Sequence, residues 1–254
     1  SCASWGRAKL KREGAFATSG GEGQPLERVG VDLVGPTLPD VHGRTLLVNS
    51  RDLGSGYRDC NAIADKQPSS VLLAYNDMYP GTRWDQPPQC PRELGVDSGT
   101  EFLGEFYAEV SKRGTKIIPG LPHRSETNAV VERDNGELQR GAATTLDTAG
   151  FPYRFWSYAA KHYQHNRTRV PDTTGKSPFL QRFGYEDPQE LVPFGCLAYY
   201  HHDEHLKFEG RGREGAIIGY DAHSAYIVLD VRRYVESGGH QVSIYSTRDV
   251  RIDR

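Results

Sequence analysis

The stretch RVGVDLVG, residues 28–35, begins with Arg28 and continues as a short apolar run that holds one acidic residue, Asp32, near its middle. Valine, leucine and glycine in this arrangement favour a buried β-strand. In such a strand an ionised side chain is costly unless it is paired or coordinated. Two further strand-like runs, RTLLVNSRDL (44–53) and YRDCNAIA (57–64), follow after short turns. Three successive runs of this kind predict a β-meander whose first strand carries Asp32.

Downstream of the meander the sequence alternates between helical and strand-like patterns. Apolar spacing typical of helices is present in five segments, namely residues 69–79, 105–114, 127–148, 153–169 and 177–184. Short buried strands are predicted over residues 93–99 and 115–120, and WDQPPQCP (84–91) is predicted to be a loop. The aromatic residues of 152–163 recur at helical spacing, which favours core packing over base stacking.

The predicted secondary structure changes near residue 190, from alternating helices and strands to strands alone. Three β-rich runs are spaced like a small barrel or sandwich: EGAIIGYD (214–221), AYIVLDVRRY (225–234) and QVSIYSTRDVRI (241–252). Near the N-terminus, residues 13–26 are rich in glycine and lack apolar periodicity, which indicates a linker. We therefore expect an N-terminal segment with its linker over residues 1–26, a core over 27–190 and a small β-rich domain over 191–254.

Composition narrows the classes of protein to consider. The 254 residues are 37% hydrophobic and 10% aromatic, enough for one large domain or two smaller ones with a real core. No apolar run approaches the roughly 20 residues needed to cross a bilayer, so we expect no membrane partner. The 31 basic and 33 acidic residues give a formal net charge of −2, which offers no overall attraction to phosphate. A basic cluster, GRAKLKR (6–12), keeps a nucleic-acid partner possible.

Cysteine usage and the chain ends carry two further expectations. The cysteines at positions 2, 60, 90 and 196 are scattered without paired spacing, which favours free thiols in a reducing compartment. The chain begins with Ser1 and its only methionine is Met78, so we expect an excerpt from a longer protein.

Three acids stand where predicted strands end or a predicted helix begins. Asp97 follows an apolar run in LGVDSG (94–99), and Glu132 follows two valines in NAVVERDNGEL (128–138). Taken singly, each acid is ordinarily a turn residue, a helix cap or a solvated side chain. Taken in this order, with spacings of 65 and 35 residues, Asp32, Asp97 and Glu132 indicate two-metal phosphoryl transfer. Hard Mg²⁺ ions prefer carboxylate oxygens, and a pair of ions can stabilise both the attacking and the leaving oxygen.

The stretches around these acids resemble a known family. PLERVGVDLVGP (25–36), VDSGTEF (96–102) and NAVVERDN (128–135) resemble the three-acid motif of retroviral and retrotransposon integrases. The downstream block PFGCLAYYHH, GREGAIIGYD, AYIVLD and STRDV is similar to the copia-type branch, so the resemblance covers nearly the whole chain. It implies an α/β fold with a ribonuclease-H-like core, a mixed five-stranded sheet flanked by helices. A small β-rich, barrel-like domain would follow this core.

The resemblance also implies a reaction and its cofactors. Asp32 would bridge two Mg²⁺ or Mn²⁺ ions, while Asp97 and Glu132 would each complete one side. The enzyme would trim the ends of the element's DNA, and the freed 3′ hydroxyl would attack a target phosphodiester. Zinc would be needed only in an upstream module that is absent here, whose end Cys2 would mark. The family further implies double-stranded DNA partners, a homo-oligomer, and a nuclear site of action after assembly in cytoplasmic virus-like particles.

Five polar residues near the acids are candidates for DNA contact: His123, Asn128, Arg133, Asn135 and Arg140. A structural role stays open for several of them, since Asn128 could cap a helix and Arg133 and Asn135 could hold the core. Copia-type relatives commonly carry basic residues two and four places after the glutamate. This chain has Asp134 and Gly136 there, so we expect Asp134 to face DNA and weaken its binding.

Two other functions compete with the enzyme. The same fold could be a catalytically decayed or host-reused DNA-binding or assembly module, which the near-neutral charge and the substitutions after Glu132 favour. A nuclease of the same superfold is disfavoured by the copia-like downstream block. The three intact acids favour the polynucleotidyl transferase.

Overall fold

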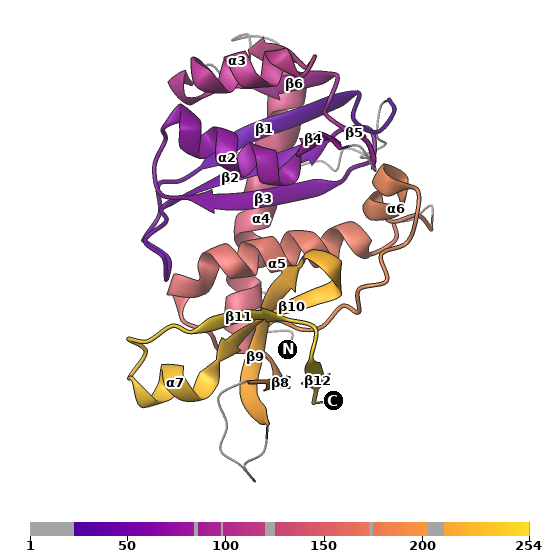
Figure 1. Ribbon diagram of the computed structural model, residues 1–254. Helices are drawn as coiled ribbons and strands as arrows, with labels where there is room; N and C mark the ends of the chain where they lie inside the picture. The colour runs from indigo at the N-terminus through magenta and orange to yellow at the C-terminus, as the bar shows by residue number, and fades with distance from the viewer. Residues whose placement is uncertain are drawn as a thin grey trace, which may run out of the picture.

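The predicted meander forms three strands of a mixed five-stranded sheet. The computed structural model describes residues 23–83, 86–97, 99–119, 125–172, 175–202 and 211–253. Strands β1 (Arg28–Val34), β2 (Leu46–Asp52) and β3 (Arg58–Ile63) pair antiparallel. On its other side β1 pairs in parallel with β6 (Glu93–Val96), and β6 pairs in parallel with β7 (Lys116–Pro119). The sheet is mixed and five-stranded, as predicted, and its strand order is β3-β2-β1-β6-β7 (Figure 1).

One face of this sheet packs against α2 (Pro68–Met78) and α3 (Glu105–Lys112). Alternation along β1 directs Val29 and Val31 to this face, where both are buried. Phe102, in the short 3₁₀ turn η1 (Thr100–Phe102), is 1% exposed and packs in the same cluster. These contacts form the first hydrophobic core.

The opposite face is covered by α4 (Ser125–Ala149) and α5 (Trp156–Arg169), the latter preceded by the 3₁₀ turn η2 (Tyr153–Phe155). The two helices pack closely at Gly141. A Cβ built there would lie only 2.3 Å from the Tyr163 ring. Helix α5 contacts β3 on one side and the second sheet on the other (Figure 1). Phe155 and Trp156 are buried and Tyr158 and Tyr163 pack against the same cluster, as the core-packing prediction expected, whereas Tyr153 is exposed.

The second sheet confirms the β-rich tail. Its five strands are β8 (Cys196–His201), β9 (Gly212–Asp221), β10 (Ala225–Asp230), β11 (Ile244–Thr247) and β12 (Val250–Ile252). All pairs are antiparallel, in the order β11-β10-β9-β8-β12. Ile218 and Leu229 of this sheet share a hydrophobic cluster with α4 and α5, so the sheet packs against the helical layer. Closure into a barrel stays a prediction.

Two local predictions are wrong. Part of the predicted loop 84–91 is a strand, β5 (Gln86–Gln89), which pairs with β4 (Gly81–Arg83) in a small ribbon. Its prolines lack N–H donors, which suggested a loop, but prolines are tolerated in edge strands. The predicted strand 225–234 ends at Asp230, which caps α7 (Val231–Glu236) by accepting the Arg233 N–H at 2.9 Å.

The predicted short helix is present as α6 (Pro178–Phe183), capped by the Ser177 side chain and ended by left-handed Gly184. Cys60, Cys90 and Cys196 are free, in agreement with the prediction for those three, and Cys2 lies outside the described residues. In the described part of the chain, no helix combines the length and apolarity needed to cross a membrane.

Candidate active site

Strand register brings the first two acids to one edge of the sheet. In the parallel pair of β1 and β6, Arg28 stands beside Glu93 and Gly30 beside Gly95, an offset of 65 residues. Asp97 follows Asp32 by the same 65 residues (97 − 32 = 65), so continuing the register puts it beside Asp32. The carboxyl ends of parallel strands meet at the same sheet edge, which is where ligands bind in many α/β folds.

The third acid reaches this edge from helix α4, which packs against both β1 and β6. Glu132 is exposed, whereas Val131 beside it is buried. Burial raises the pKa of Asp32 above its usual range, and the nearby negative charges of Asp97 and Glu132 raise it further. The carboxylates of Asp97 and Glu132 are therefore both near enough to Asp32 for their charges to act on it.

Two hydrogen bonds hold the Asp32 carboxylate. The Leu33 backbone N–H donates to Oδ1 at 2.8 Å, and the Asn135 amide Nδ2 donates to Oδ2 at 2.6 Å. Both bonds lower the pKa of Asp32 and so oppose the larger effect of its burial. Each oxygen of an ionised carboxylate has two acceptor sites, so both oxygens of Asp32 keep one for a further ligand.

Asp97 lies just past β6 and is exposed, with its Oδ1 accepting the Gly99 N–H at 3.0 Å. Gly99 packs closely against the end of the Glu101 side chain. A Cβ built there would lie 2.5 Å from the carboxylate of Glu101, which is itself only 8% exposed. A larger residue at position 99 would therefore require the Glu101 side chain to shift.

Chemically, the three acids suit a hard divalent cation. Oxygen ligands are those that Mg²⁺ and Mn²⁺ prefer. The pKa of Asp32 is raised by burial and, to a smaller extent, by the negative charges of Asp97 and Glu132, and a bound cation would offset these effects. Within the described residues, no group of three or more His, Cys, Asp or Glu side chains is placed so that it could hold a metal ion. Asp97 and Glu132 are both exposed, so their carboxylates are open to solvent.

The candidate DNA-contacting residues are spread over different environments. Arg133 is exposed and Arg140 half-buried on α4, while Asn135 has its amide bound on both sides by Asp32 and Asn49. Asn128 lies in α4, but its side chain is outside what the structure describes, and His123 lies outside the described residues altogether.

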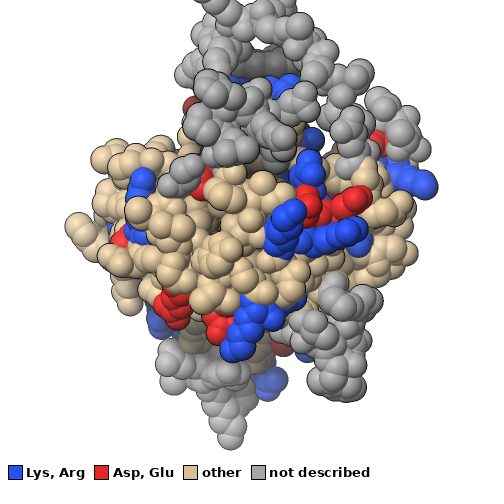
Figure 2. All heavy atoms as spheres, turned by 90° about the horizontal axis from the view of Figure 1, so that it is seen from above, with Lys and Arg blue, Asp and Glu red and all other residues tan. Residues whose placement is uncertain are grey.

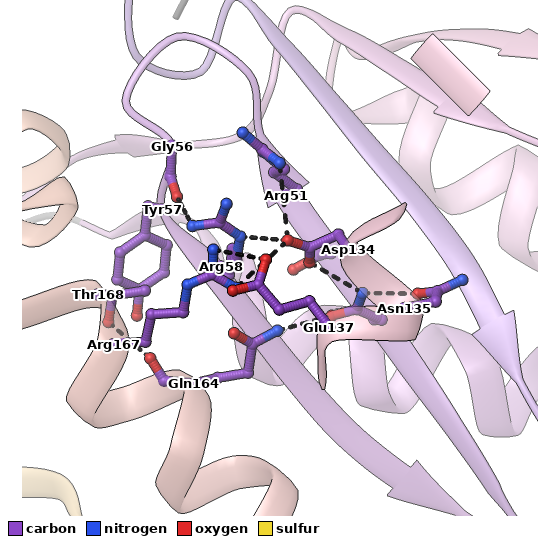
Figure 3. A network of polar contacts seen from close by, with 12 residues as sticks. Arg51, Gly56, Tyr57, Arg58, Asp134, Asn135, Glu137, Gln164, Arg167 and Thr168 are labelled. Carbon is purple, nitrogen blue, oxygen red and sulfur yellow. Dashed lines mark hydrogen bonds and ion pairs between the residues drawn. The ribbon is translucent and has the colours of Figure 1, made fainter. Parts of the chain in front are cut away.

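The expectation that Asp134 faces DNA is wrong. Its side chain is buried, at 1% exposure for the residue, and accepts hydrogen bonds from Arg58 and from Asn49 Nδ2, the latter at 3.2 Å. Arg51 Nη1 lies 3.6 Å and Arg167 Nη1 4.0 Å from the same Asp134 carboxylate, as Figure 3 shows. Asp134 thus joins α4 to the sheet and to α5.

Helix periodicity explains this burial. The inward positions of α4 follow one another at spacings of three and four residues: Val131, Asp134, Leu138, Ala142 and Leu146. That spacing was visible in the sequence and could have identified Asp134 as an inward residue. The resemblance to copia-type integrases indicated a surface contact with DNA instead, and this interpretation of position 134 was wrong.

Sequence reasoning missed the partners of Asp134. Asn49 and Arg51 alternate along β2 toward the face that α4 covers, and Arg58 stands opposite Arg51 on β3. Burial, together with the positive charges of Arg58 and Arg167, lowers the pKa of Arg51 to about 10. The sequence did hold a signal for these partners: Asn49, Arg51 and Arg58 are polar residues within predicted strands. Buried polar groups need hydrogen-bond or charge partners.

The charges on the face seen in Figure 2 are mixed in sign. Basic and acidic side chains lie there in small groups among uncharged residues. This distribution agrees with the near-zero net charge of the sequence. Attraction of a polyanion to this face would therefore depend on local groups, not on a broad field.

Comparison with models of known protein families finds no match, and comparison with curated proteins finds none either. The functional assignment therefore depends on the site's residues and their arrangement.

Proposed function

We propose that this protein is a divalent-metal-dependent polynucleotidyl transferase of the copia-type integrase kind, with a ribonuclease-H-like core. One observation carries the proposal: Asp32, Asp97 and Glu132 approach one edge of a mixed five-stranded sheet closely enough to raise the pKa of Asp32. The ordinary alternatives, separate turn, cap and surface acids, give no reason for the three to meet.

The chain's own residues would hold and orient the reacting groups. When bound, two Mg²⁺ or Mn²⁺ ions would activate the attacking oxygen and stabilise the leaving one. Asp32, on a central strand, would contact both ions, and Asp97 and Glu132 would each contact one. Leu33 N–H and the Asn135 amide keep Asp32 oriented toward the edge of the sheet.

The substrate follows from the sequence resemblance. Water would first cleave a phosphodiester near each end of the element's DNA, leaving a free 3′ hydroxyl. That hydroxyl would attack a phosphodiester of the target, forming one P–O bond as another breaks. Because bonds of the same kind are exchanged, the joining step needs no separate energy source. The partners would be double-stranded DNA and further copies of the chain, acting in the nucleus after assembly in cytoplasmic virus-like particles.

A joining assay tests the proposal. Purified protein should join a short duplex carrying an element end to a target duplex in Mg²⁺ or Mn²⁺. Asp97→Asn should abolish joining, because the amide cannot replace a charged ligand. Asp77→Asn, the same change at an exposed position of α2 on the opposite face of the sheet, should leave joining unchanged. DNA binding without joining by the unaltered protein would instead support the decayed or host-reused binding module.

A further inference from the structure

The carboxylate of Asp32 is connected to the interior by two successive amides. Asn135 Nδ2 donates to Asp32 Oδ2 at 2.6 Å, and Asn49 Nδ2 donates to Asn135 Oδ1 at 2.7 Å. Asn49 is fully buried on β2, directly opposite Asp32 on β1. These three side chains therefore form one chain of hydrogen bonds from strand to helix and back.

The carboxylates at the two ends of this hydrogen-bond chain determine which group of each amide donates and which accepts. The same Asn49 Nδ2 donates to Asp134 Oδ2 at 3.2 Å. Ionised carboxylates only accept hydrogen bonds, so the NH₂ group of Asn49 must face Asp134 and that of Asn135 must face Asp32. With both amides in these orientations, the Asn135 carbonyl is left to accept from Asn49. No alternative flip satisfies all three bonds.

At the inner end of this hydrogen-bond chain, Asp134 is held by positively charged arginines. Asp134 is hydrogen-bonded to Arg58, and Arg51 and Arg167 lie within 4.0 Å of it (Figure 3). Gln164 on α5 adds a second restraint, because its Nε2 donates to Asn49 Oδ1 at 3.2 Å. Asn49 is thus held from three directions and can move little without breaking buried bonds.

From this geometry we propose that Asn135 and Asn49 are positioning residues, which set the Asp32 carboxylate for metal binding by linking it to the buried Asp134–arginine network. The inference rests on the proposed function, since it concerns how the first acid of that site is oriented. Hydrogen-bond partners behind metal ligands fix ligand orientation, and their loss typically weakens metal affinity about 10- to 100-fold. Neither amide needs to touch the ion.

Mn²⁺ affinity is the measurement that separates positioning from general structural support. Titration calorimetry on the full chain at pH 7.5 should give a dissociation constant at least about 10-fold higher for Asn135→Ala than for the unaltered protein. The substitution leaves the net charge unchanged, so a lower affinity cannot come from a lost ligand charge. Asn166→Ala is the matched control: it removes an amide from α5 that donates to the Val192 carbonyl, at 3.5 Å. Its Mn²⁺ affinity should equal that of the unaltered protein.

A second measurement needs no variant, should Asn135→Ala not fold. In side-chain amide NMR spectra of the unaltered protein, added Mg²⁺ should shift the NH₂ signals of Asn135 and leave those of Asn166 in place. An Asn135 signal that stays put while Mg²⁺ binds would overturn the inference, as would equal Mn²⁺ affinity of Asn135→Ala and the unaltered protein. Absence of specific Mn²⁺ binding by the unaltered protein would overturn the proposed function together with the inference.

Discussion

Replacing Asp134 by asparagine should destabilise the protein severely, although the residue is two places from an exposed acid. The substitution keeps the size of the side chain and removes its charge. Asp134 is 1% exposed and Arg58 8%, so little water can replace the lost carboxylate. Three guanidinium groups would then face one another with only the Glu137 carboxylate, which lies 2.8 Å from Arg167 Nη2, to balance them.

The magnitude follows from the contacts. At about 4 Å and an effective dielectric constant of about 20, each arginine interacts with Asp134 by about 4 kcal/mol before desolvation is subtracted. Measured losses on removing one partner of a buried ion pair are about 3–5 kcal/mol. Whole domains unfold with about 5–15 kcal/mol, so Asp134→Asn should remove a large part of the stability. Asp134→Lys, which would add a fourth positive charge beside the three arginines, should not fold.

Urea denaturation followed by circular dichroism measures this effect. Asp147→Asn, the same change at an exposed position of α4, should alter the unfolding free energy by no more than about 0.5 kcal/mol. A loss below about 1 kcal/mol for Asp134→Asn, or a loss equal to that of Asp147→Asn, would refute the buried-network reasoning.

Three further results are expected. Burial lowers the pKa of His162 to about 4, so it is neutral in the folded protein and gains a proton on unfolding below pH about 6.5. The contribution of His162 to the unfolding free energy is therefore complete above pH 6.5. Between pH 6.5 and 4 this contribution falls by about 1.4 kcal/mol per pH unit. A His162→Phe variant whose unfolding free energy depended equally steeply on pH would contradict this. Mn²⁺ at 100 times its dissociation constant should stabilise the native state by about 2.7 kcal/mol, which would be visible as a higher melting temperature. Asp32→Asn should abolish this rise in melting temperature. An equal rise in both proteins would exclude a carboxylate site. Gly141→Ala should lower the melting temperature because its Cβ would meet the Tyr163 ring, whereas Gly136→Ala, at a roomier position of the same helix, should raise it by removing a helical glycine.

The parts of the fold that could be predicted are those determined by the pattern of a few consecutive residues. The alternation of Val29 and Val31 with Gly30 and Asp32 is a property of eight consecutive residues, and the structure keeps it. The α-helical predictions succeeded for the same reason. The cap at Asp230 was also local, but the β-branched residues before it outweighed one polar residue in the pattern.

The network around Asp134 could not be predicted in this way. Arg58 precedes Asp134 by 76 residues, and no pattern within one element connects them. Only the pairing of β2 with β3 and the docking of α4 on that face bring the charges together. The inward spacing of α4 could indicate that Asp134 is buried, but its three arginine partners depend on tertiary structure.

Burial of Asp134 and exposure of Glu132 are two results of one helix orientation. An α-helix turns by about 100° per residue, so positions 132 and 135 lie close to one another on its surface while 134 points elsewhere. Asn135 contacts Asp32, and Glu132 is near enough to Asp32 to raise its pKa. The arginines that bind Asp134 hold α4 in this rotation, since a shift of one residue would put a neighbouring side chain against them. The charge that looked like a defect in a DNA-binding surface therefore orients the helix that brings the third acid to the site.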